Sequence, residues 1–556
     1  MVHASSDASK NALAIHRQGV WPLVTGAEMQ ALDRQTIETR GISGEILMES
    51  AGRALVRPAL ELRVISARQE APIRAFCGAG NNGGDGFVLV RHLWAEGIAA
   101  EAILIGDPAR LPRDAASNWK RLEAIAAPRR AVDPGDEDVD WDRLLSQTSV
   151  AIDALFGTGL KREISGGFAR LIESFATARV RGLQVLSVDI PSGVSAHSGR
   201  ILGVAVSADR TLTISLPKIG LVLEPGRSRA GEIEVARVGI ADPDPSRLPR
   251  VELWNEKAAA RHFPQRARAG HKGVFGHVLV VAGSRGMMGA ASLCARASLR
   301  SGSGLVTLAH PGGLNAELAG LPAEVMTAEV AATAAGGFAR AAEKGIEELV
   351  ASRDVLALGP GLGREPEVID LVRRLIVSID RPIVLDADGL FGLSGQLELL
   401  HNHQAPRVLT PHPGEAARLL ETDVSALNSD RVAAARQLSD RSRAIVVLKG
   451  AGTVVADPTG RVLIIPTGGP VLASGGTGDV LTGIVAALLA AGRPAFEAAA
   501  LAAWWHGATA DKLDPARGGF GVLASEIADG LPECAAQIID SNAVGEPDAD
   551  LDLRFP

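Results

Sequence analysis

The chain has 556 residues, of which 46% are hydrophobic and 22% charged, and its formal net charge is −7. This length exceeds what one hydrophobic core usually supports, so we expect more than one domain. The acidic balance argues against general nucleic-acid binding, which needs a basic surface. Cys77, Cys294 and Cys534 are widely spaced and odd in number, so we expect neither a disulfide framework nor a zinc cluster, and we expect a cytoplasmic location.

The N-terminal segment lacks the long apolar core of a signal peptide, and no apolar run is long enough to cross a membrane. The most hydrophobic segment, 480–492, is short and is better explained as a buried helix. We expect residues 1–20 and the tail after about 540 to be disordered or loosely attached. No membrane partner is therefore predicted.

Short β-branched runs alternate with amphipathic stretches on both sides of segment 239–253. That segment holds three prolines and alternating charges, which suit neither a helix nor a strand, so it is expected to be a linker. Strand and helix alternation predicts α/β domains with parallel sheets covered by helices on both faces. The predicted strands lie within 73–77, 99–106, 149–157, 183–193, 277–284, 304–311, 355–363, 382–390, 407–415 and 444–456.

A glycine-rich turn, GAGNNGGDGF at 78–87, directly follows the first of these strands. Small residues free backbone N–H groups to face an anion, and the next helix presents its N-terminus to the same place. A tight strand-to-helix turn explains the glycines alone. Asn81, Asn82 and Asp85 add polar chemistry that such a turn does not need, so the turn predicts a ligand loop.

Polar side chains also end two later strands: Asp153 in 149–157, and Asp189 with Ser192 in 183–193. Each alone is most simply a helix cap or a turn residue. In a parallel sheet, however, Asn82, Asp153 and Ser192 meet at the carboxyl edge, where ligands bind. Their oxygens suit an alkali or alkaline-earth cation, so together they predict a cation site.

These motifs, with TGAEMQALDRQTIETRGISGEILMESAGRA at 25–54, resemble the epimerase domain of the NAD(P)H-hydrate repair enzymes over about residues 21–238. The resemblance implies a Rossmann-like three-layer domain that interconverts the R and S forms of hydrated NADH or NADPH. It also implies potassium (K⁺) at Asn82, Asp153 and Ser192, and Asp189 is the candidate general base. Ser50 replaces the family's usual asparagine, which is expected to change only local hydrogen bonding. The implied substrate-binding residues are Asn81, Asn82, Gly83, Gly84, Asp85, Gly157, Thr158, Gly159, Leu160, Lys161, Arg162, Glu163 and Asp189.

The second half centres on ASGGTGD at 473–479, which precedes a long apolar helix. Gly475, Gly476 and Gly478 let backbone amides approach a phosphate closely. Asp479 then lies beside that phosphate, where a carboxylate is awkward for binding but useful as a base for a hydroxyl that attacks phosphorus. The simpler alternative is an aspartate N-cap after a flexible loop.

This turn does not follow the Walker pattern and resembles the anion hole of ribokinase-like kinases. Segments 270–309, 358–364, 384–390, 409–420 and 448–460 further resemble the dehydratase partner of the epimerase, over about residues 254–535. The resemblance implies a ribokinase-like α/β domain, placed at 254–540, that dehydrates the S form at the expense of ADP, with Mg²⁺. The implied contacts are Ala290, Gly361, His412 and Asp479 for the hydrated nucleotide, and Lys449, Gly450, Ala451, Gly452, Thr453 and Gly478 for ADP.

Several of these positions have a chemical rationale of their own. His412 stands between two prolines, which we expect to stiffen its loop and hold the imidazole away from a helix. The LKGAGT turn at 448–453 offers a cation and free amides to phosphates, although a β-hairpin turn explains it too. Asp386 and Asp388 end a strand and are candidates to order Mg²⁺ or substrate, ranked below Asp479.

Two other interpretations compete with this one. The glycine-rich turn with Asp479 also suits a small-molecule kinase that releases a phosphorylated product. The N-terminal half could instead be a non-catalytic nucleotide-binding module, although Asp189 and the three cation-site residues argue against that. The predicted partners are the hydrated cofactors and ADP, and a homo-oligomer is expected, of a size that the sequence does not fix.

Overall fold

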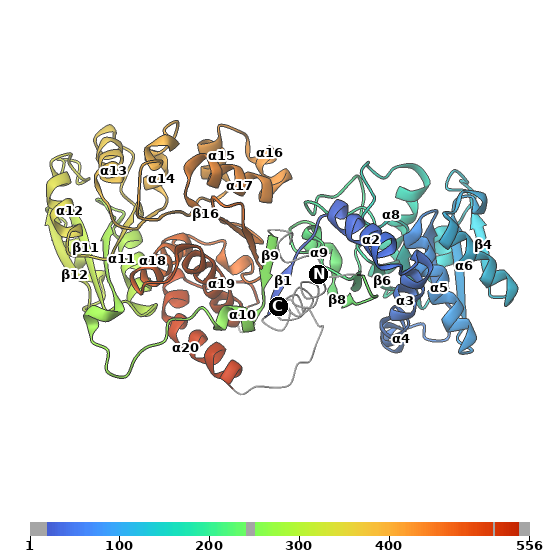
Figure 1. Cartoon of the computed structure of the whole chain (residues 1–556). Coiled ribbons are helices and arrows are strands. Elements are labelled where there is room, and N and C mark those ends of the chain that lie inside the picture. The colour runs from blue at the N-terminus through green and yellow to red at the C-terminus, as the bar shows by residue number, and fades with distance from the viewer. Residues whose placement is uncertain (1–18, 241–250, 515–517, 544–556) are drawn as a thin grey trace, which may run out of the picture. The chain divides into compact units, whose positions relative to one another are not determined.

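The computed structural model describes residues 19–240, 251–514 and 518–543 and divides into two compact units, each with its own sheet (Figure 1). The chain passes from the first unit to the second between residues 240 and 251. The expected extensions at 1–20 and after 540 lie largely outside the described residues. Within the described part, Val20 begins a strand and Ala543 ends a helix.

The first unit contains a seven-stranded sheet with the order β4-β3-β2-β5-β6-β7-β8. Every neighbouring pair in it is parallel, as the alternation of strand and helix predicted. The strands are β2 (Ile73–Gly78), β3 (Ala100–Ile105), β4 (Arg129–Val132), β5 (Val150–Ala154), β6 (Gln184–Val188), β7 (Arg210–Ile214) and β8 (Glu232–Ala236).

Alternate side chains of the central strands serve two separate cores, one on each face of this sheet. Ala75 and Cys77 pack into the larger core, whereas Phe76 between them enters the other. There Phe76 meets Phe175 edge to face, with ring centroids 5.1 Å apart. The larger core is covered by α3 (Gly44–Ala54), α4 (Val56–Ile65), α5 (Asn81–Ala95) and α6 (Arg113–Ala124), and the other by α7 (Trp141–Ser146) and α8 (Gly166–Val180).

The second unit is built on an eleven-stranded sheet with the order β1-β9-β18-β17-β16-β15-β14-β13-β10-β11-β12. Its part from β12 to β16 is parallel, as predicted. The strands are β1 (Val20–Pro22), β9 (Val251–Trp254), β10 (His277–Val281), β11 (Leu305–Pro311), β12 (Met326–Val330), β13 (Val355–Leu358), β14 (Ile383–Leu385), β15 (Arg407–Leu409), β16 (Ile445–Leu448), β17 (Thr453–Ala456) and β18 (Val462–Ile465).

Two local expectations are wrong. The run 444–456 is not one strand but an antiparallel hairpin of β16 and β17, because Gly450 and Gly452, with φ of 143° and 67°, reverse the chain. The linker expected at 239–253 ends before β9, in which Val251 and Leu253 are buried and pair parallel with β18. The three prolines all precede that strand, and residues 241–250 lie outside the described part of the chain.

Helices cover both faces of the second sheet (Figure 1). One face carries α11 (Met288–Arg300), α18 (Thr477–Ala490), α19 (Ala495–Leu513) and α20 (Ala524–Ala543). The other carries α12 (Ala342–Val350), α13 (Pro366–Ser378), α14 (Asp388–Gly392), α15 (Pro413–Leu420), α16 (Val424–Ser429) and α17 (Arg431–Ser442).

Helix α18 confirms the buried helix predicted from the apolar run at 480–492. It packs so closely on α11 that a methyl group on Gly483 would lie 2.3 Å from the carbonyl oxygen of Cys294. Among the residues that the structure describes, no helix has the length and apolar character needed to cross a membrane. All three cysteines are buried free thiols, as expected from their spacing.

Candidate active sites

A cavity of about 980 Å³ lies at the carboxyl ends of β2, β5 and β6 in the first unit. This is the edge at which an open parallel sheet binds its ligand. The volume suits a ligand of cofactor size. Most of the residues implied by the resemblance line it, namely Asn81, Asn82, Asp85, Gly157, Thr158, Gly159, Leu160, Lys161, Arg162 and Asp189.

Three implied residues do not line the cavity. Gly83 and Gly84 are buried at the start of α5, where a Cβ would lie 2.0 Å from the carbonyl oxygen of Gly78 or 2.6 Å from the sulfur of Met48. These two glycines therefore allow the helix to approach the strand before it and α3. Glu163 is exposed beyond the end of the loop that holds Lys161 and Arg162.

Asp153 is fully buried beneath this cavity and is surrounded by neutral hydrogen-bond donors. Its carboxylate accepts from the Ser192 hydroxyl at 2.5 Å, the Ser192 amide at 2.8 Å and the Ser187 hydroxyl at 2.8 Å. Burial raises the pKa of Asp153, and the bonds from Ser192 and Ser187 oppose that shift. The expected meeting of Asp153 and Ser192 is thus observed, and no described cation neutralises the carboxylate.

Asn82 reaches the same region from the second residue of α5. Its side-chain oxygen lies beside Gly157, the first residue of the cavity loop after β5, where an added Cβ would be 3.2 Å away. Its Nδ2 is buried without a hydrogen-bond acceptor among the described residues. Because the N-cap of α5 is Gly80 and makes no side-chain bond, the simple explanation of Asn82 as a helix cap is excluded.

Asp189 follows β6 with φ of 68°, a conformation unusual for a residue other than glycine. Its carboxylate accepts from the amide of Ile214 at 2.9 Å and forms an ion pair with Lys218. Lys218 is fully buried and also donates to the hydroxyl of Thr213 at 3.1 Å. Burial lowers the pKa of Lys218, while the charge of Asp189 opposes the shift. Asp189 is therefore held in place by an ion pair and a backbone hydrogen bond.

Sequence reasoning missed Lys218, although its position as a single charge in the apolar run 211–223 was a usable signal. It also missed cavity-lining charges outside the glycine motifs, Asp33, Arg110 and Asp114. No local pattern marks these three, because the fold brings them to the cavity from separate segments. Burial raises the pKa of Asp85 well above its usual range, and the charges of Asp189 and Asp33 add to the shift.

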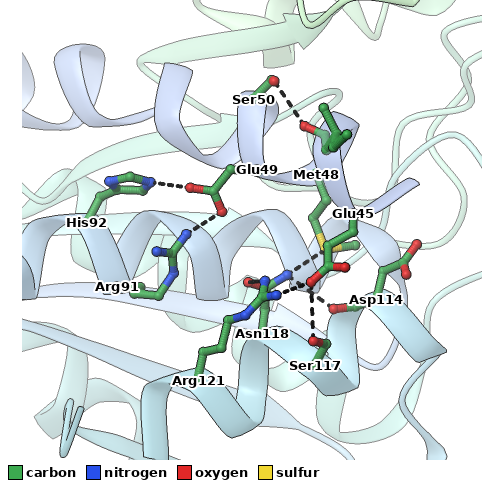
Figure 2. Close-up of polar contacts among 11 residues, drawn as sticks. Glu45, Met48, Glu49, Ser50, Arg91, His92, Asp114, Ser117, Asn118 and Arg121 are labelled. Atoms are coloured by element: carbon green, nitrogen blue, oxygen red, sulfur yellow. Dashed lines mark hydrogen bonds and ion pairs between the residues drawn. The ribbon is translucent and has the colours of Figure 1, made fainter. Parts of the chain in front are cut away.

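A polar network fixes the helix that forms one wall of this cavity (Figure 2). Figure 2 shows Glu45 of α3 paired with Arg121 of α6, and Glu49 of α3 paired with Arg91 and His92 of α5. The network therefore clamps α3, which carries the cavity-lining Met48, onto both neighbouring helices.

Ser50 lies on the same helix and donates to the carbonyl oxygen of Ile46 at 2.9 Å (Figure 2). That bond lies within α3 itself. The expected effect of this departure from the family pattern, a change in local hydrogen bonding, stays a prediction.

In the second unit, Asp479 lies in the first turn of α18 without capping it. The N-cap is Gly476 with φ of 92°, and it makes no side-chain bond, so the N-cap alternative for Asp479 is excluded. Burial, followed by the charge of Asp386, raises the pKa of Asp479 to about 7, and Lys449 opposes the shift. This carboxyl has no hydrogen-bond partner among the described residues, which leaves it available to a ligand.

Asp386 is almost completely buried next to Asp479, and its carboxylate is already engaged. It accepts from the ammonium of Lys449 at 2.8 Å and from the hydroxyl of Thr482 at 2.7 Å. Asp388 is engaged as well, by the Arg364 side chain at 2.7 Å and the Gly363 amide at 3.0 Å. Neither carboxylate fits direct coordination of Mg²⁺ in this arrangement, and no group of three or more His, Cys, Asp or Glu side chains among the described residues is placed to hold a metal.

His412 differs from the expectation. The imidazole is exposed, but it is the N-cap of α15, and its Nδ1 accepts from the amides of Gly414 at 3.0 Å and Glu415 at 3.3 Å. Glu415 in turn accepts from the amide of His412 at 2.8 Å, which completes a capping box. The prediction that the prolines hold this side chain away from a helix is wrong, because Pro413 is itself favoured as the first helical residue.

The remaining predicted residues converge on the same edge of the second sheet. A Cβ on Gly361 would lie 3.3 Å from Cβ of Ala290, so these two residues adjoin. The amide of Lys449 donates to the carbonyl of Pro411 at 2.9 Å, which joins the ends of β15 and β16. A Cβ on Gly478 would lie 3.2 Å from the Lys449 ammonium. The fold and these two sites define an α/β enzyme with one cavity of cofactor size and one cluster of acidic side chains at the N-terminus of α18.

Known protein families match both the N-terminal and the C-terminal half of the chain. A family model described as YjeF-related protein N-terminus matches residues 44–220, and one described as NAD(P)H-hydrate dehydratase matches residues 278–533. The bifunctional NAD(P)H-hydrate repair enzyme Nnr of Moorella thermoacetica is 39% identical over 92% of this chain and 96% of its own. The enzyme of the same name from Thermofilum pendens is 38% identical over 91% of this chain and 95% of its own.

The chain belongs to the family of bifunctional NAD(P)H-hydrate repair enzymes. The two α/β domains expected from the sequence are confirmed. Among solved structures, the ADP/ATP-dependent NAD(P)H-hydrate dehydratase of Bacillus subtilis, co-crystallised with ATP and Mg²⁺, is 30% identical. The match has a TM-score of 0.46 and covers 51% of this chain and 98% of that one.

Proposed function

We propose that this chain repairs hydrated NADH and NADPH. The N-terminal domain, assigned to residues 21–238, interconverts the R and S hydrates, and the C-terminal domain, assigned to 254–540, dehydrates the S hydrate while converting ADP to AMP and phosphate. The observation that carries the proposal is the half-buried, unpartnered carboxyl of Asp479 at the N-terminus of α18. Family membership supplies the substrate class.

Dehydration begins when Asp479 accepts the proton of the hydroxyl group on the hydrated ring. The hydroxyl oxygen then attacks the terminal phosphorus of ADP, and AMP departs. Backbone amides of Gly476 to Gly478, at the positive end of α18, face the charge that develops on the phosphoryl oxygens. The lone pair of the ring nitrogen next expels phosphate, and loss of a ring proton restores the dihydronicotinamide.

The ADP site is assigned to Lys449–Thr453 and Gly478, and the hydrate site to Ala290, Gly361, His412 and Asp479. Lys449 lies between Asp386 and the turn before α18, where its ammonium can also reach a phosphate. Mg²⁺ is assigned to the nucleotide itself, since this ion prefers phosphate oxygens and water as ligands. It would supply further neutralisation of phosphate charge, and Asp386 and Asp388 already have other partners.

Epimerisation uses Asp189 as the general base. The carboxylate, held by Lys218, takes the proton of the hydroxyl group, and the bond between the hydrated carbon and the ring nitrogen breaks to give an aldehyde. The ring nitrogen takes up a proton, for which buried Asp85 is the candidate donor, and the aldehyde closes again from its other face. Lys161 and Arg162, exposed at the cavity, suit the diphosphate of the substrate.

Potassium is assigned to Asn82, Asp153 and Ser192. The fit rests on Asp153, a buried carboxylate with only neutral donors, and on Asn82, whose amide can turn over to direct its oxygen at the same place. Replacing K⁺ by tetramethylammonium, which is too large for the site, is expected to lower the epimerisation rate at least about tenfold. An unchanged rate in potassium-free buffer would contradict the assignment.

Location and assembly complete the proposal. A cytoplasmic location accords with three buried free thiols and with substrates that are soluble cofactors. The homo-oligomeric state stays a prediction, which sedimentation equilibrium of the purified chain would test.

The division of labour is testable with mixed R and S hydrates, ADP, and the absorbance of the reduced nicotinamide. Asp479→Asn is expected to abolish the absorbance recovery while epimerisation continues, because only dehydration needs that base. Asp189→Asn or Asp85→Asn should halt recovery after the S form is consumed. A persistent phosphorylated product without recovered absorbance would instead favour a small-molecule kinase.

The pH dependence of dehydration provides a further test. With a pKa of about 7, Asp479 becomes protonated as the pH falls through neutrality, so kcat/KM for the S hydrate should decrease about tenfold per unit below pH 7. Asp386→Asn removes the negative charge beside Asp479, which should lower the pKa of Asp479 and move the decrease of kcat/KM to lower pH. Asp370→Asn, on the distant helix α13, is the control and should leave the profile unchanged. If Asp386→Asn leaves the acidic decrease of kcat/KM at the same pH, or moves it to higher pH, the assignment of Asp479 is contradicted.

A further inference from the structure

The turn between β16 and β17 rests on a single buried arginine from α17. Arg431, the first residue of that helix, is 8% exposed. Its Nη2 donates to the carbonyl oxygens of Leu448 at 3.2 Å, Lys449 at 3.2 Å and Gly452 at 3.4 Å. One guanidinium group therefore donates hydrogen bonds to three carbonyl groups that span the turn from one end to the other.

These bonds determine which way the backbone of the turn faces. In a trans peptide the N–H points opposite to the C=O of the same unit, so the carbonyl of Lys449 facing Arg431 turns the amide of Gly450 outward. Gly450 has φ of 143°, and a Cβ there would lie 2.8 Å from both terminal nitrogens of Arg431. A side chain on residue 450 would collide with the guanidinium of Arg431, so glycine is needed there. The amide of Gly450 therefore faces outward on an exposed turn.

The charge of Arg431 lacks a counterion among the described residues. Its remaining contact is the side-chain oxygen of Asn428 at 3.5 Å, and its Nε has no acceptor. Burial lowers the pKa of Arg431 to about 10, so the group stays cationic at neutral pH. An unpaired buried cation is destabilising unless an anion is bound nearby.

Arg436, on the same helix, is an arginine with an ordinary structural role and serves as a comparison for Arg431. Its Nε donates to the carbonyl of Gly460 at 3.3 Å, in the turn between β17 and β18, and it is only half-buried. That turn carries none of the residues assigned to a ligand. Arg436 is therefore a matched comparison: an arginine of α17 that supports a neighbouring turn of the same sheet.

We propose that Arg431 is a positioning residue for the nucleotide, and that it supplies positive charge which the nucleotide phosphates neutralise. It holds the turn 449–453 with the Gly450 amide outward and places a buried cation directly behind it. The inference rests on the assignment of this turn to ADP and deepens it, because it explains how an exposed, glycine-rich turn is ready to receive an anion.

The test compares Arg431→Met, Arg431→Lys and Arg436→Met in the full chain. Arg431→Met should raise the Kd of ADP, measured by calorimetry, and its KM by about 10- to 100-fold, as expected for loss of a charged hydrogen-bonding group. The KM of the S hydrate and kcat at saturating ADP should stay within about twofold. Arg431→Lys should restore part of the affinity, since it keeps the charge but not the fork of donors.

Arg436→Met should leave the affinity for ADP unchanged even where it lowers the melting temperature. Equal ADP affinity in Arg431→Met and the unaltered chain would overturn the inference, as would equal losses from the two arginine-to-methionine changes. Arg431→Lys provides the same comparison where the methionine variant does not fold. An unaltered chain that binds no adenine nucleotide would contradict the proposed function itself, whereas intact binding with no effect at Arg431 contradicts only this inference.

Discussion

Partial burial of the Asp479 carboxyl is the constraint on which the C-terminal site depends. A carboxylate partly shielded from water is unfavourable unless it is paired, and Asp479 has no partner among the described residues. What surrounds it instead is an arrangement that holds its pKa near neutrality: Asp386 raises it, and Lys449 opposes. The glycines before α18 leave room for a phosphate beside it, so the carboxyl is placed to exchange a proton with a ligand.

The N-terminal domain also shields carboxylates from water, but it stabilises them in other ways. Asp189 is paired with a buried lysine, whereas Asp153 is surrounded by hydroxyl and amide donors and is proposed to hold a metal ion. Both lie at the carboxyl edge of a parallel sheet, where strand ends from distant parts of the sequence meet. The two domains thus place acidic side chains at equivalent edges of two different sheets, and we propose that one opens a ring and that the other assists phosphate transfer.

Much of this arrangement could be predicted, because most of the site residues directly follow a predicted strand. Asn82, Asp153, Asp189, Ser192 and Asp479 each follow a recognisable apolar run or glycine turn. The parallel fold brings the first four to one edge of the N-terminal sheet and Asp479 to an edge of the other sheet.

What could not be predicted depends on contacts between distant segments. The pairing of Lys218 with Asp189 and of Lys449 with Asp386 spans 29 and 63 residues, and nothing local specifies either partner. His412 was misjudged because the capping box with Glu415 outweighed the stiffness of two prolines. The strand β9 was missed because its pairing partner, β18, lies two hundred residues further on.

The central claim is that the hydroxyl group of the hydrate leaves as phosphate. It is tested most directly by labelling that hydroxyl with ¹⁸O and following one turnover with ADP in unlabelled water. Attack of the hydroxyl oxygen on phosphorus predicts one ¹⁸O atom in the released phosphate, and none in water. Label found in water, with unlabelled phosphate, would show that nucleotide hydrolysis and dehydration are separate events and would contradict the role given to Asp479.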